Sequence, residues 1–541
     1  MDSDLDSDMD SDFGSDSDGS IDSLDSISDT ESISDTDSLE SLDSISDTES
    51  LESLDSDCSL DEEEFEPLWK GFSYFQHQEV GIRWMLDKER RGTMVPNRDY
   101  TMSVPIYGGF QCDEMGLGKT IQIVGTILNN PLQNTLLIVP LAMIDTWTQI
   151  CKKCDFQVFH MGPMGWTRAR SQQSQINVYI TNYHKLISRK LLFRKNLINR
   201  LWDRVVLDEA HMIRNGKGIM SKCAREIRAR VRWVVSGTPL VNGTRDLVSL
   251  LAFLGVPYAE NWAWEPRYND VLPQMLIHRS MDMLRKDATI DVPPIPQVSD
   301  IVLPFETVEE EEFYNGVQVS NERLISRFNV LPPQQKLILL LRLRQISVHP
   351  QVYIEAINKD KNKTNCKVSD WVGSSTKLMA IERLIKEEEE EEEENHKYLI
   401  FCSFHEEMML IRRSLTCVKP SNILMYHGGM SQTERSSTLA RSKRMKGTTV
   451  MLIQIQAGGV GLNLQEYDRV LFVSPYWTAA LMDQALARAV RMGQKEVVKV
   501  YHLKLAVENN DLCLNIDQLV SGKAEIKRDL LLKVFDMCEP E

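Results

Sequence analysis

The chain has 541 residues, of which 42% are hydrophobic and 26% are charged, so it is long enough to hold two or three domains with buried cores. It has no N-terminal apolar segment of the signal-peptide type, and Arg342 and Arg344 interrupt the apolar run from Leu337 to Leu341 before it reaches membrane-spanning length. The ten cysteines are scattered, which favours reduced thiols over a disulfide framework. These features exclude the secreted and membrane-spanning classes, and we expect a soluble, intracellular protein with no membrane partner.

Residues 1–66 differ from the rest of the chain in composition. They contain 26 Asp or Glu residues and no Lys or Arg, and the segment 33–44 recurs at 45–56 with one change. Such a sequence cannot bury enough apolar surface to offset its ordering entropy, which predicts a disordered acidic N-terminal tail. Because the whole chain has a net charge of −18 and the tail −26, residues 67–541 have +8. A basic body favours a polyanionic partner, although a merely solvated surface is the alternative.

The folded part begins near Pro67, and its first motif is a phosphate loop at residues 111–120, with the sequence Gln-Cys-Asp-Glu-Met-Gly-Leu-Gly-Lys-Thr. Gly116 and Gly118 allow the backbone to turn tightly and to direct N–H groups at an anion. Lys119 supplies a positive charge to the β and γ phosphates of a nucleotide, and Thr120 offers a hydroxyl to magnesium. The stretch therefore predicts a nucleotide-binding site.

The elements around this loop support the interpretation. Apolar residues from Ile121 to Leu128 recur at helical spacing, so the loop is expected to open a helix. Upstream, residues 72–91 are predicted to form a helix from which the amide of Gln78 can contact an adenine edge, with an ordinary surface residue as the alternative interpretation. Asp113 stands where the strict pattern has Gly, so the motif by itself leaves a chance glycine-rich turn as an alternative.

Three short apolar runs, at 135–139, 178–181 and 204–207, alternate with helical segments and predict a doubly wound parallel sheet. Two adjacent carboxylates follow the third run, and buried carboxylates are costly unless they meet a cation. We therefore expect Asp208 to hold magnesium and Glu209 to orient and deprotonate water, with an exposed acidic turn as the alternative.

The second half of the chain repeats this pattern. Residues 450–453 and 469–473 are short apolar runs that predict a further parallel sheet. Arg488 and Arg491 are three residues apart, so on a helix they would share one face and could reach a γ-phosphate held by the first lobe. A solvated basic face is the alternative interpretation of this pair.

Taken together, these motifs resemble the Swi/Snf-type branch of the superfamily-two helicases, which are ATP-driven translocases on double-stranded DNA. The matching stretches share order as well as sequence: they lie at 78–85, 113–120, 137–141, 208–215, 236–242, 342–350, 399–404, 427–435, 457–464 and 484–494. The family also lacks the first Gly of the phosphate loop, so Asp113 fits it. The chain departs from the family at Ala487 and Val490, where the last motif usually has Asp and His, but both arginines of that motif are present.

The resemblance implies two RecA-like lobes of the α/β class, joined by a helical segment. We expect a disordered tail at 1–66, an ATP-binding lobe at 67–255, a helical connection at 256–372 and a second lobe at 373–541 with an acidic loop at 387–394 and C-terminal helices. It implies catalytic roles for Lys119, Asp208, Glu209, Arg488 and Arg491. It assigns nucleotide binding to Gln78, Asp113, Glu114, Met115, Gly116, Leu117, Gly118, Lys119, Thr120 and Gly461, and magnesium binding to Thr120 and Asp208.

The expected activity is that of a DNA-dependent ATPase which uses ATP and magnesium, translocates on double-stranded DNA and remodels chromatin or other DNA–protein complexes in transcription or repair. Nucleosomes or DNA-bound proteins, a nuclear location and a monomeric motor follow from the same resemblance, as does a likeness to the compact global transactivators of large DNA viruses. Two alternatives remain open. One is a strand-separating DEAH-type helicase, and the other is a transcription transactivator that works mainly through its acidic tail.

Overall fold

The computed structural model describes residues 65–97, 101–168, 175–188, 191–241, 243–259, 267–286, 292–360, 367–392, 395–458, 462–507 and 514–538. The described residues from position 65 onward belong to one compact unit, and the predicted tail lies outside the described residues up to position 64. None of the helices in these ranges is both long and apolar enough to cross a membrane.

The first lobe contains an eight-stranded sheet whose neighbouring strands are parallel except for one antiparallel pair at its edge. In spatial order the strands are β10 (Leu276–Ile277), β3 (Gly108–Gln111), β9 (Ala229–Val235), β8 (Trp202–Asp208), β4 (Asn134–Val139), β7 (Asn177–Asn182), β5 (Gln157–Gly162) and β6 (Gly165–Arg168). The three apolar runs predicted as strands correspond to β4, β7 and β8.

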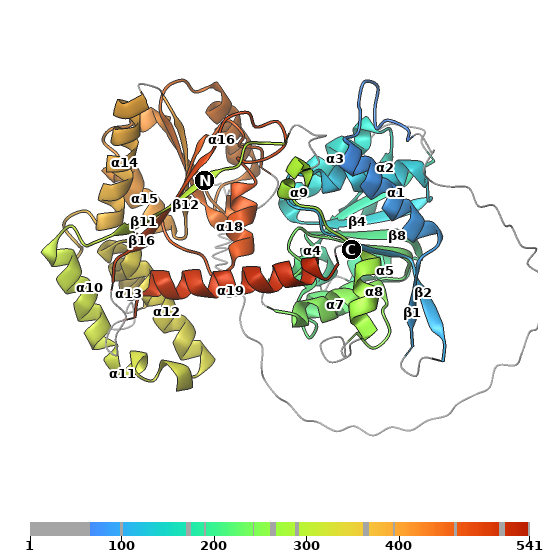
Figure 1. Ribbon diagram of the computed structural model, residues 1–541, viewed down its shortest axis with the longest axis horizontal. Coiled ribbons are helices and arrows are strands. Elements are labelled where there is room, and N and C mark those ends of the chain that lie inside the picture. Colours follow the sequence, from blue (N-terminus) through green and yellow to red (C-terminus); the bar gives the residue numbers. More distant parts are fainter. Residues whose placement is uncertain are drawn as a thin grey trace, which may run out of the picture. The chain divides into compact units, whose positions relative to one another are not determined.

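Helices cover both faces of this sheet because alternate residues of each strand point in opposite directions. Leu137 and Val139 of β4 pack with α1 (Gln76–Arg90), α2 (Lys119–Asn129) and α3 (Ile144–Lys153). Leu136 and Ile138 of the same strand belong to a second cluster on the other face. The helices of that cluster are α4 (Tyr183–Leu186), α5 (Leu191–Ile198), α6 (Ile219–Arg225), α7 (Arg245–Leu254) and α8 (Arg267–Met275). Figure 1 shows α1, α2 and α3 on one side of β4 and β8, and α4, α5, α7 and α8 on the other. The doubly wound fold is confirmed.

The second lobe contains a six-stranded sheet in which every neighbouring pair is parallel. Its strands, in spatial order, are β11 (Gln297–Leu303), β16 (Lys499–Leu505), β15 (Arg469–Phe472), β12 (Lys397–Cys402), β14 (Thr449–Gln454) and β13 (Ile423–Tyr426). Tyr398 and Ile400 of β12 pack with α14 (Thr376–Glu392) and α15 (His405–Ser414). Leu399 and Phe401 pack on the opposite face with α16 (Gln432–Arg444), α17 (Ile455–Gly458) and α18 (Ala479–Leu486).

The connecting segment is less uniformly helical than expected. Its α-helices within the described residues are α8, α9 (Met281–Lys286), α10 (Val308–Ser320), α11 (Glu322–Ile325), α12 (Pro333–Val348) and α13 (Pro350–Asp360). However, β10 and β11 also lie in the range 256–372, and they pair with β3 of the first sheet and with β16 of the second. Each sheet therefore extends into the expected connection. A hairpin of β1 (Thr93–Pro96) and β2 (Ser103–Ile106), which the sequence did not predict, precedes β3.

Three local predictions need correction. The helix predicted for 72–91 begins at Gln76. The acidic loop predicted at 387–394 was wrong, because helix α14 continues to Glu392 and Glu388 is buried in an ion pair with Arg469. In place of several C-terminal helices, the described part of the chain after β16 has α19 (Ile516–Asp536) alone, and its last turn packs with the core of the first lobe through Val534 and Phe535.

Candidate active site

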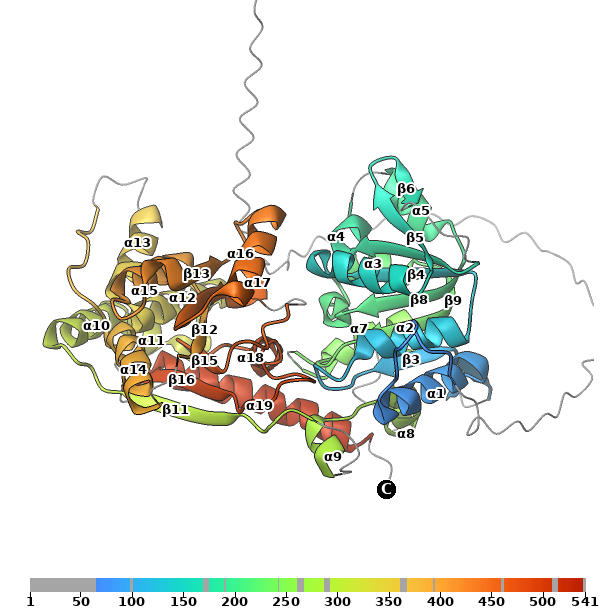
Figure 2. The ribbon, with the colours of Figure 1, turned by 90° about the horizontal axis from the view of Figure 1, so that it is seen from above.

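The phosphate loop connects β3 to α2, and Figure 2 shows α1 and α2 beside β3. Gly116 and Gly118 have φ angles of 97° and 81°, which lie in the left-handed region that favours glycine. A Cβ atom at Gly118 would lie 2.5 Å from Nε2 of Gln78, so space is a second requirement at this position. Gly118 directly precedes α2, as the sequence predicted, and the N-terminus of that helix favours a bound anion.

Lys119 is held by its own loop. Its ammonium group donates hydrogen bonds to the carbonyl oxygens of Asp113, at 2.8 Å, and of Glu114, at 3.3 Å. A phosphate group could replace these neutral acceptors with charged ones, which form stronger hydrogen bonds with an ammonium donor. Thr120, one residue further on, is half-buried in the first turn of α2. The loop therefore presents the groups that a nucleotide phosphate and its metal require.

Asp208 lies at the carboxyl end of β8, where two aromatic residues fix it. Its Oδ2 accepts a hydrogen bond of 2.7 Å from the indole N–H of Trp147, and its backbone oxygen accepts one of 2.7 Å from the hydroxyl of Tyr183. Burial, and then the neighbouring charge of Glu209, raises the pKa of Asp208. A divalent cation would offset both effects, so this carboxylate fits a magnesium ligand.

Glu209 follows in a strained conformation, with φ at 52°, which is uncommon for a residue other than glycine. Within the described part of the chain its Oε2 has no hydrogen-bond partner, and it lies 3.4 Å from Nδ1 of His211. That nitrogen in turn lies 3.5 Å from the hydroxyl of Ser236, at the end of β9. Burial raises the pKa of Glu209, whereas the positive charges of Lys119 and Arg488 lower it. The effect of burial is larger, so the environment of this carboxylate favours accepting a proton.

The two arginines of the last motif lie beside these groups. Burial lowers the pKa of Arg488, whereas the carboxylates of Glu209 and Asp208 raise it, which places the guanidinium within electrostatic reach of both. A Cβ atom at Gly116 would lie 3.4 Å from Cβ of Arg491. The helical spacing expected for this pair was wrong: α18 ends at Leu486, and both arginines lie on the turns that follow it.

The remaining predicted residues are distributed as follows. The side-chain amide of Gln78 is buried, and its N–H donates to the carbonyl of Leu117 at 3.4 Å, so Gln78 contacts the phosphate loop directly. Gly461 lies outside the described residues. The sequence did not predict the contributions of Trp147, Tyr183 or Arg279, which depend on contacts between distant parts of the chain.

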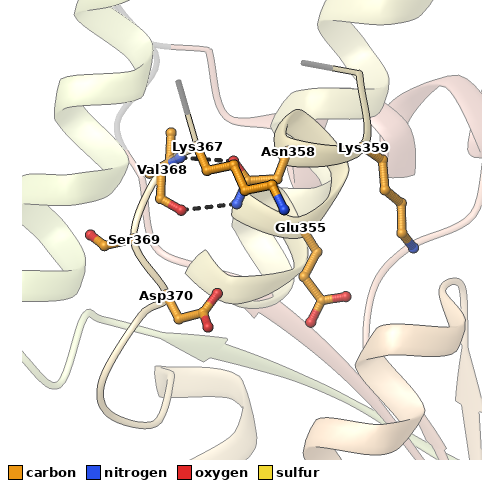
Figure 3. A pocket seen from close by; sticks show the side chains of 7 residues that line it. All are labelled: Glu355, Asn358, Lys359, Lys367, Val368, Ser369 and Asp370. Atoms are coloured by element: carbon orange, nitrogen blue, oxygen red, sulfur yellow. Dashed lines mark hydrogen bonds between the residues drawn. The ribbon is translucent and has the colours of Figure 1, made fainter. Parts of the chain in front are cut away.

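A hollow of about 430 Å³ lies elsewhere, on the connecting segment (Figure 3). Its walls come from α13 and from residues 367–370, which Asn358 joins by two hydrogen bonds with the backbone of Val368, of 2.8 and 2.9 Å. The lining mixes Glu355 and Asp370 with Lys359 and Lys367, and it includes no residue of the phosphate loop or of the Asp208–Glu209 pair. This hollow is therefore separate from the phosphate loop.

The chain is similar in sequence to known helicase-like proteins. The sequence matches the SNF2-related domain over residues 77–362 and the helicase conserved C-terminal domain over residues 376–493. It is 27% identical to a probable global transactivator of Orgyia pseudotsugata multicapsid polyhedrosis virus, over 85% of this chain and 91% of that protein.

Two larger relatives are similar over part of their length. The chain is 24% identical to the SWI/SNF-related matrix-associated actin-dependent regulator of chromatin subfamily A member 1 of Mus musculus, over 83% of this chain and 44% of that protein. It is 24% identical to the DNA repair protein RAD5B of Arabidopsis thaliana, over 73% of this chain and 43% of that protein. The chain thus spans less than half the length of these two relatives. Because the SNF2-related match covers more than half of the chain and the helicase C-terminal match follows it, the protein belongs to the SNF2-related family and is a helicase-like enzyme that hydrolyses ATP.

Proposed function

We propose that this enzyme couples ATP hydrolysis to translocation along double-stranded DNA, and that it thereby moves or displaces proteins bound to that DNA. The observation that carries the proposal is the position of Arg488 and Arg491. Both follow α18 of the second lobe, yet Arg491 lies against Gly116 of the first lobe and Arg488 is within electrostatic reach of Glu209. A nucleotide bound here would contact residues of both lobes, so its hydrolysis would change the contacts between the lobes.

In this proposal each residue has a defined task. Lys119 and the backbone N–H groups of the phosphate loop hold the phosphates, and Thr120 and Asp208 are the magnesium ligands. Magnesium, when bound, neutralises part of the phosphate charge. Glu209 accepts the proton of the attacking water, and Arg488 and Arg491 stabilise the negative charge on the transferred phosphoryl group.

Two observations support duplex DNA as the polymer along which the enzyme moves. Residues 67–541 have a net charge of +8, and the run Glu387–Glu394 contributes −8 of that total, so the rest of the body is more basic still. Among the relatives are a regulator of chromatin and a DNA repair protein. We accordingly propose nucleosomes or other DNA-bound proteins as targets, a monomeric motor and a nuclear site of action.

The test compares ATP turnover without nucleic acid and with linear double-stranded DNA, single-stranded DNA or single-stranded RNA. Duplex DNA is expected to stimulate turnover most, and the stimulation should fall steeply as salt rises because phosphate contacts release counterions. Translocation is measured separately, as displacement of a third strand from a DNA triplex, with Arg491→Ala as the inactive control. Equal stimulation by single-stranded RNA, or separation of the strands of a blunt duplex, would contradict the proposal and favour a strand-separating helicase.

A further inference from the structure

The edge of the first sheet next to β3 is formed by a short segment that reaches the phosphate loop itself. β10 pairs with β3 in parallel, with Leu276 opposite Phe110 and Ile277 opposite Gln111. The pairing continues beyond both strands. The N–H of Cys112 donates to the carbonyl of Ile277, and the N–H of Glu114 donates to that of Arg279, both at 2.8 Å. Residues 276–279 therefore pair with the chain from Phe110 to Glu114, which includes the end of β3 and the start of the phosphate loop.

The side chain of Arg279 makes a second set of contacts. Its Nε donates to Oδ1 of Asp113 at 3.0 Å, and its Nη2 donates to Oδ2 of the same carboxylate. Its Nη1 donates to the carbonyl of His77 in α1, one residue before Gln78. A single guanidinium thus connects the phosphate loop to the helix that carries the proposed adenine contact.

Asp113 places a buried negative charge at the start of the phosphate loop. Its side chain is fully buried, in a loop that has to accept a polyanion. The amides of Gln111 and Gln122 each donate to Oδ2 at 2.8 Å, but amides are neutral and do not cancel the charge of the carboxylate. Burial raises the pKa of Asp113, yet the charge and hydrogen bonds of Arg279, together with the Gln122 hydrogen bond and the charge of Lys119, lower it overall, which favours the ionised pair. Arg279 is therefore the charged partner that Asp113 contacts.

The position of Asp113 also determines that of Lys119, because its carbonyl oxygen accepts the hydrogen bond of 2.8 Å from the lysine ammonium. We propose that Arg279 is a positioning residue of the nucleotide site: its bidentate pair with Asp113 cancels a negative charge beside the phosphates, and its bond to His77 keeps α1 in register with the phosphate loop. The inference rests on the proposed ATP site.

The test measures the affinity for ATP with magnesium, kcat and KM, and the melting temperature, in four variants, with a fifth, Arg279→Lys, for the case in which Arg279→Gln does not fold. Arg279→Gln leaves the carboxylate of Asp113 buried without its charged partner, and we expect about 10- to 100-fold weaker ATP binding with a parallel rise in KM. Asp113→Asn combined with Arg279→Gln removes both charges, so it should recover most of the lost affinity. Lys286→Gln, which removes an exposed charge at the end of the neighbouring helix α9, is the matched control and should leave KM unchanged.

A purely structural role for Arg279 predicts a different result. It would lower the melting temperature and the yield of active enzyme, while the molecules that fold would keep the wild-type KM. An unchanged KM in Arg279→Gln therefore overturns the inference, whatever the melting temperature. If Arg279→Gln does not fold, the double variant and Arg279→Lys decide, since neither leaves an uncompensated carboxylate. Each lacks the bidentate pair and should bind ATP at least about threefold more weakly than wild type, and wild-type affinity in both would refute the assignment.

Lys119→Ala, the fourth variant, separates this inference from the proposed site. If Lys119→Ala binds ATP normally, the phosphate loop is not the nucleotide site and the proposed function fails with it. If Lys119→Ala loses affinity and Arg279→Gln does not, the site stands and only the role of Arg279 is refuted.

Discussion

Lys119 and Glu209 illustrate how two charged side chains of one site can have separable tasks. The ammonium of Lys119 already points at oxygen atoms of its own loop, so it is arranged for holding an anion. Oε2 of Glu209 has no hydrogen-bond donor, and its φ of 52° holds the residue in a strained conformation beside His211. A group that binds and a group that accepts a proton should respond differently to substitution.

We predict that Glu209→Gln keeps ATP affinity within a few-fold of wild type, because Lys119, Thr120 and Asp208 remain. Turnover should fall by about 10²- to 10⁴-fold, since the amide cannot accept the proton of water. Lys119→Ala should lose both affinity and turnover. Binding is measured by titration with a slowly hydrolysed ATP analogue, and turnover by phosphate release. Normal turnover in Glu209→Gln would mean that another group is the base.

The sequence predicted site residues that belong to local motifs. It did not predict site residues that make contacts with distant parts of the chain. The phosphate loop, Asp208 and Glu209 are local motifs that end strands or open a helix, and they lie where such motifs are expected. Trp147 donates a hydrogen bond to Asp208, which is 61 residues away in the sequence, and Arg279 donates to Asp113, which is 166 residues away. A local sequence pattern cannot predict contacts at such separations. Arg488 and Arg491 reach the same site from turns, although their spacing had suggested a helix.

At the scale of single elements, the acidic run at 387–394 shows why composition can mislead. Eight consecutive glutamates suggest a solvated loop. Helical geometry, however, places Glu388 on the same face of α14 as Leu384 and Ile381, and this face packs on the second sheet. There its Oε1 accepts a hydrogen bond of 3.0 Å from Nε of Arg469 in β15, and it accepts another from the hydroxyl of Tyr501 in β16. The helix therefore continues through the run.

We predict that Glu388→Ala destabilises the protein by about 1 to 3 kcal/mol, because the buried Arg469 loses this carboxylate while its ion pair with Asp468 remains. Glu387→Ala removes the same side chain one position earlier, where it is exposed, and should change the free energy of unfolding by no more than about 0.5 kcal/mol. Urea unfolding followed by tryptophan fluorescence and circular dichroism provides the comparison. Equal effects of the two substitutions would mean that Glu388 is solvated.

Burial also explains which strands could be predicted from the sequence. The predicted ones, such as β4, β8 and β14, are continuous apolar runs because they are buried on both faces of a sheet. β11 was not predicted because it lies at the edge of the second sheet, and most of its side chains are exposed. β10 has two residues, too few for any periodicity. The doubly wound architecture was therefore predictable from its central strands, but the sheet edges that lie in the connecting segment were not.

At the scale of the whole molecule, the main feature is the separation of charge along the sequence. Residues 1–66 have −26 and residues 67–541 have +8. A polyanion that is covalently attached to a basic body is present at a high effective concentration, where it can compete with DNA for the same basic surface. Recruitment of another protein and a solubilising role are the competing explanations for such a tail.

We predict that deleting residues 1–66 raises the affinity for duplex DNA most at low salt, and that the difference from the full chain shrinks as salt increases. The Debye length is about 10 Å at 0.1 M and shortens further above it, so competition through charge weakens progressively. The measurement is fluorescence anisotropy of a labelled duplex across a salt series. A full-length control in which the acidic residues of the tail are replaced by Asn and Gln keeps the length but removes the charge, and it should match the deletion. If the deletion, the neutralised chain and the wild type bind DNA equally at low salt, the tail is not a competitor for DNA, and recruitment of a partner becomes the better account of its charge.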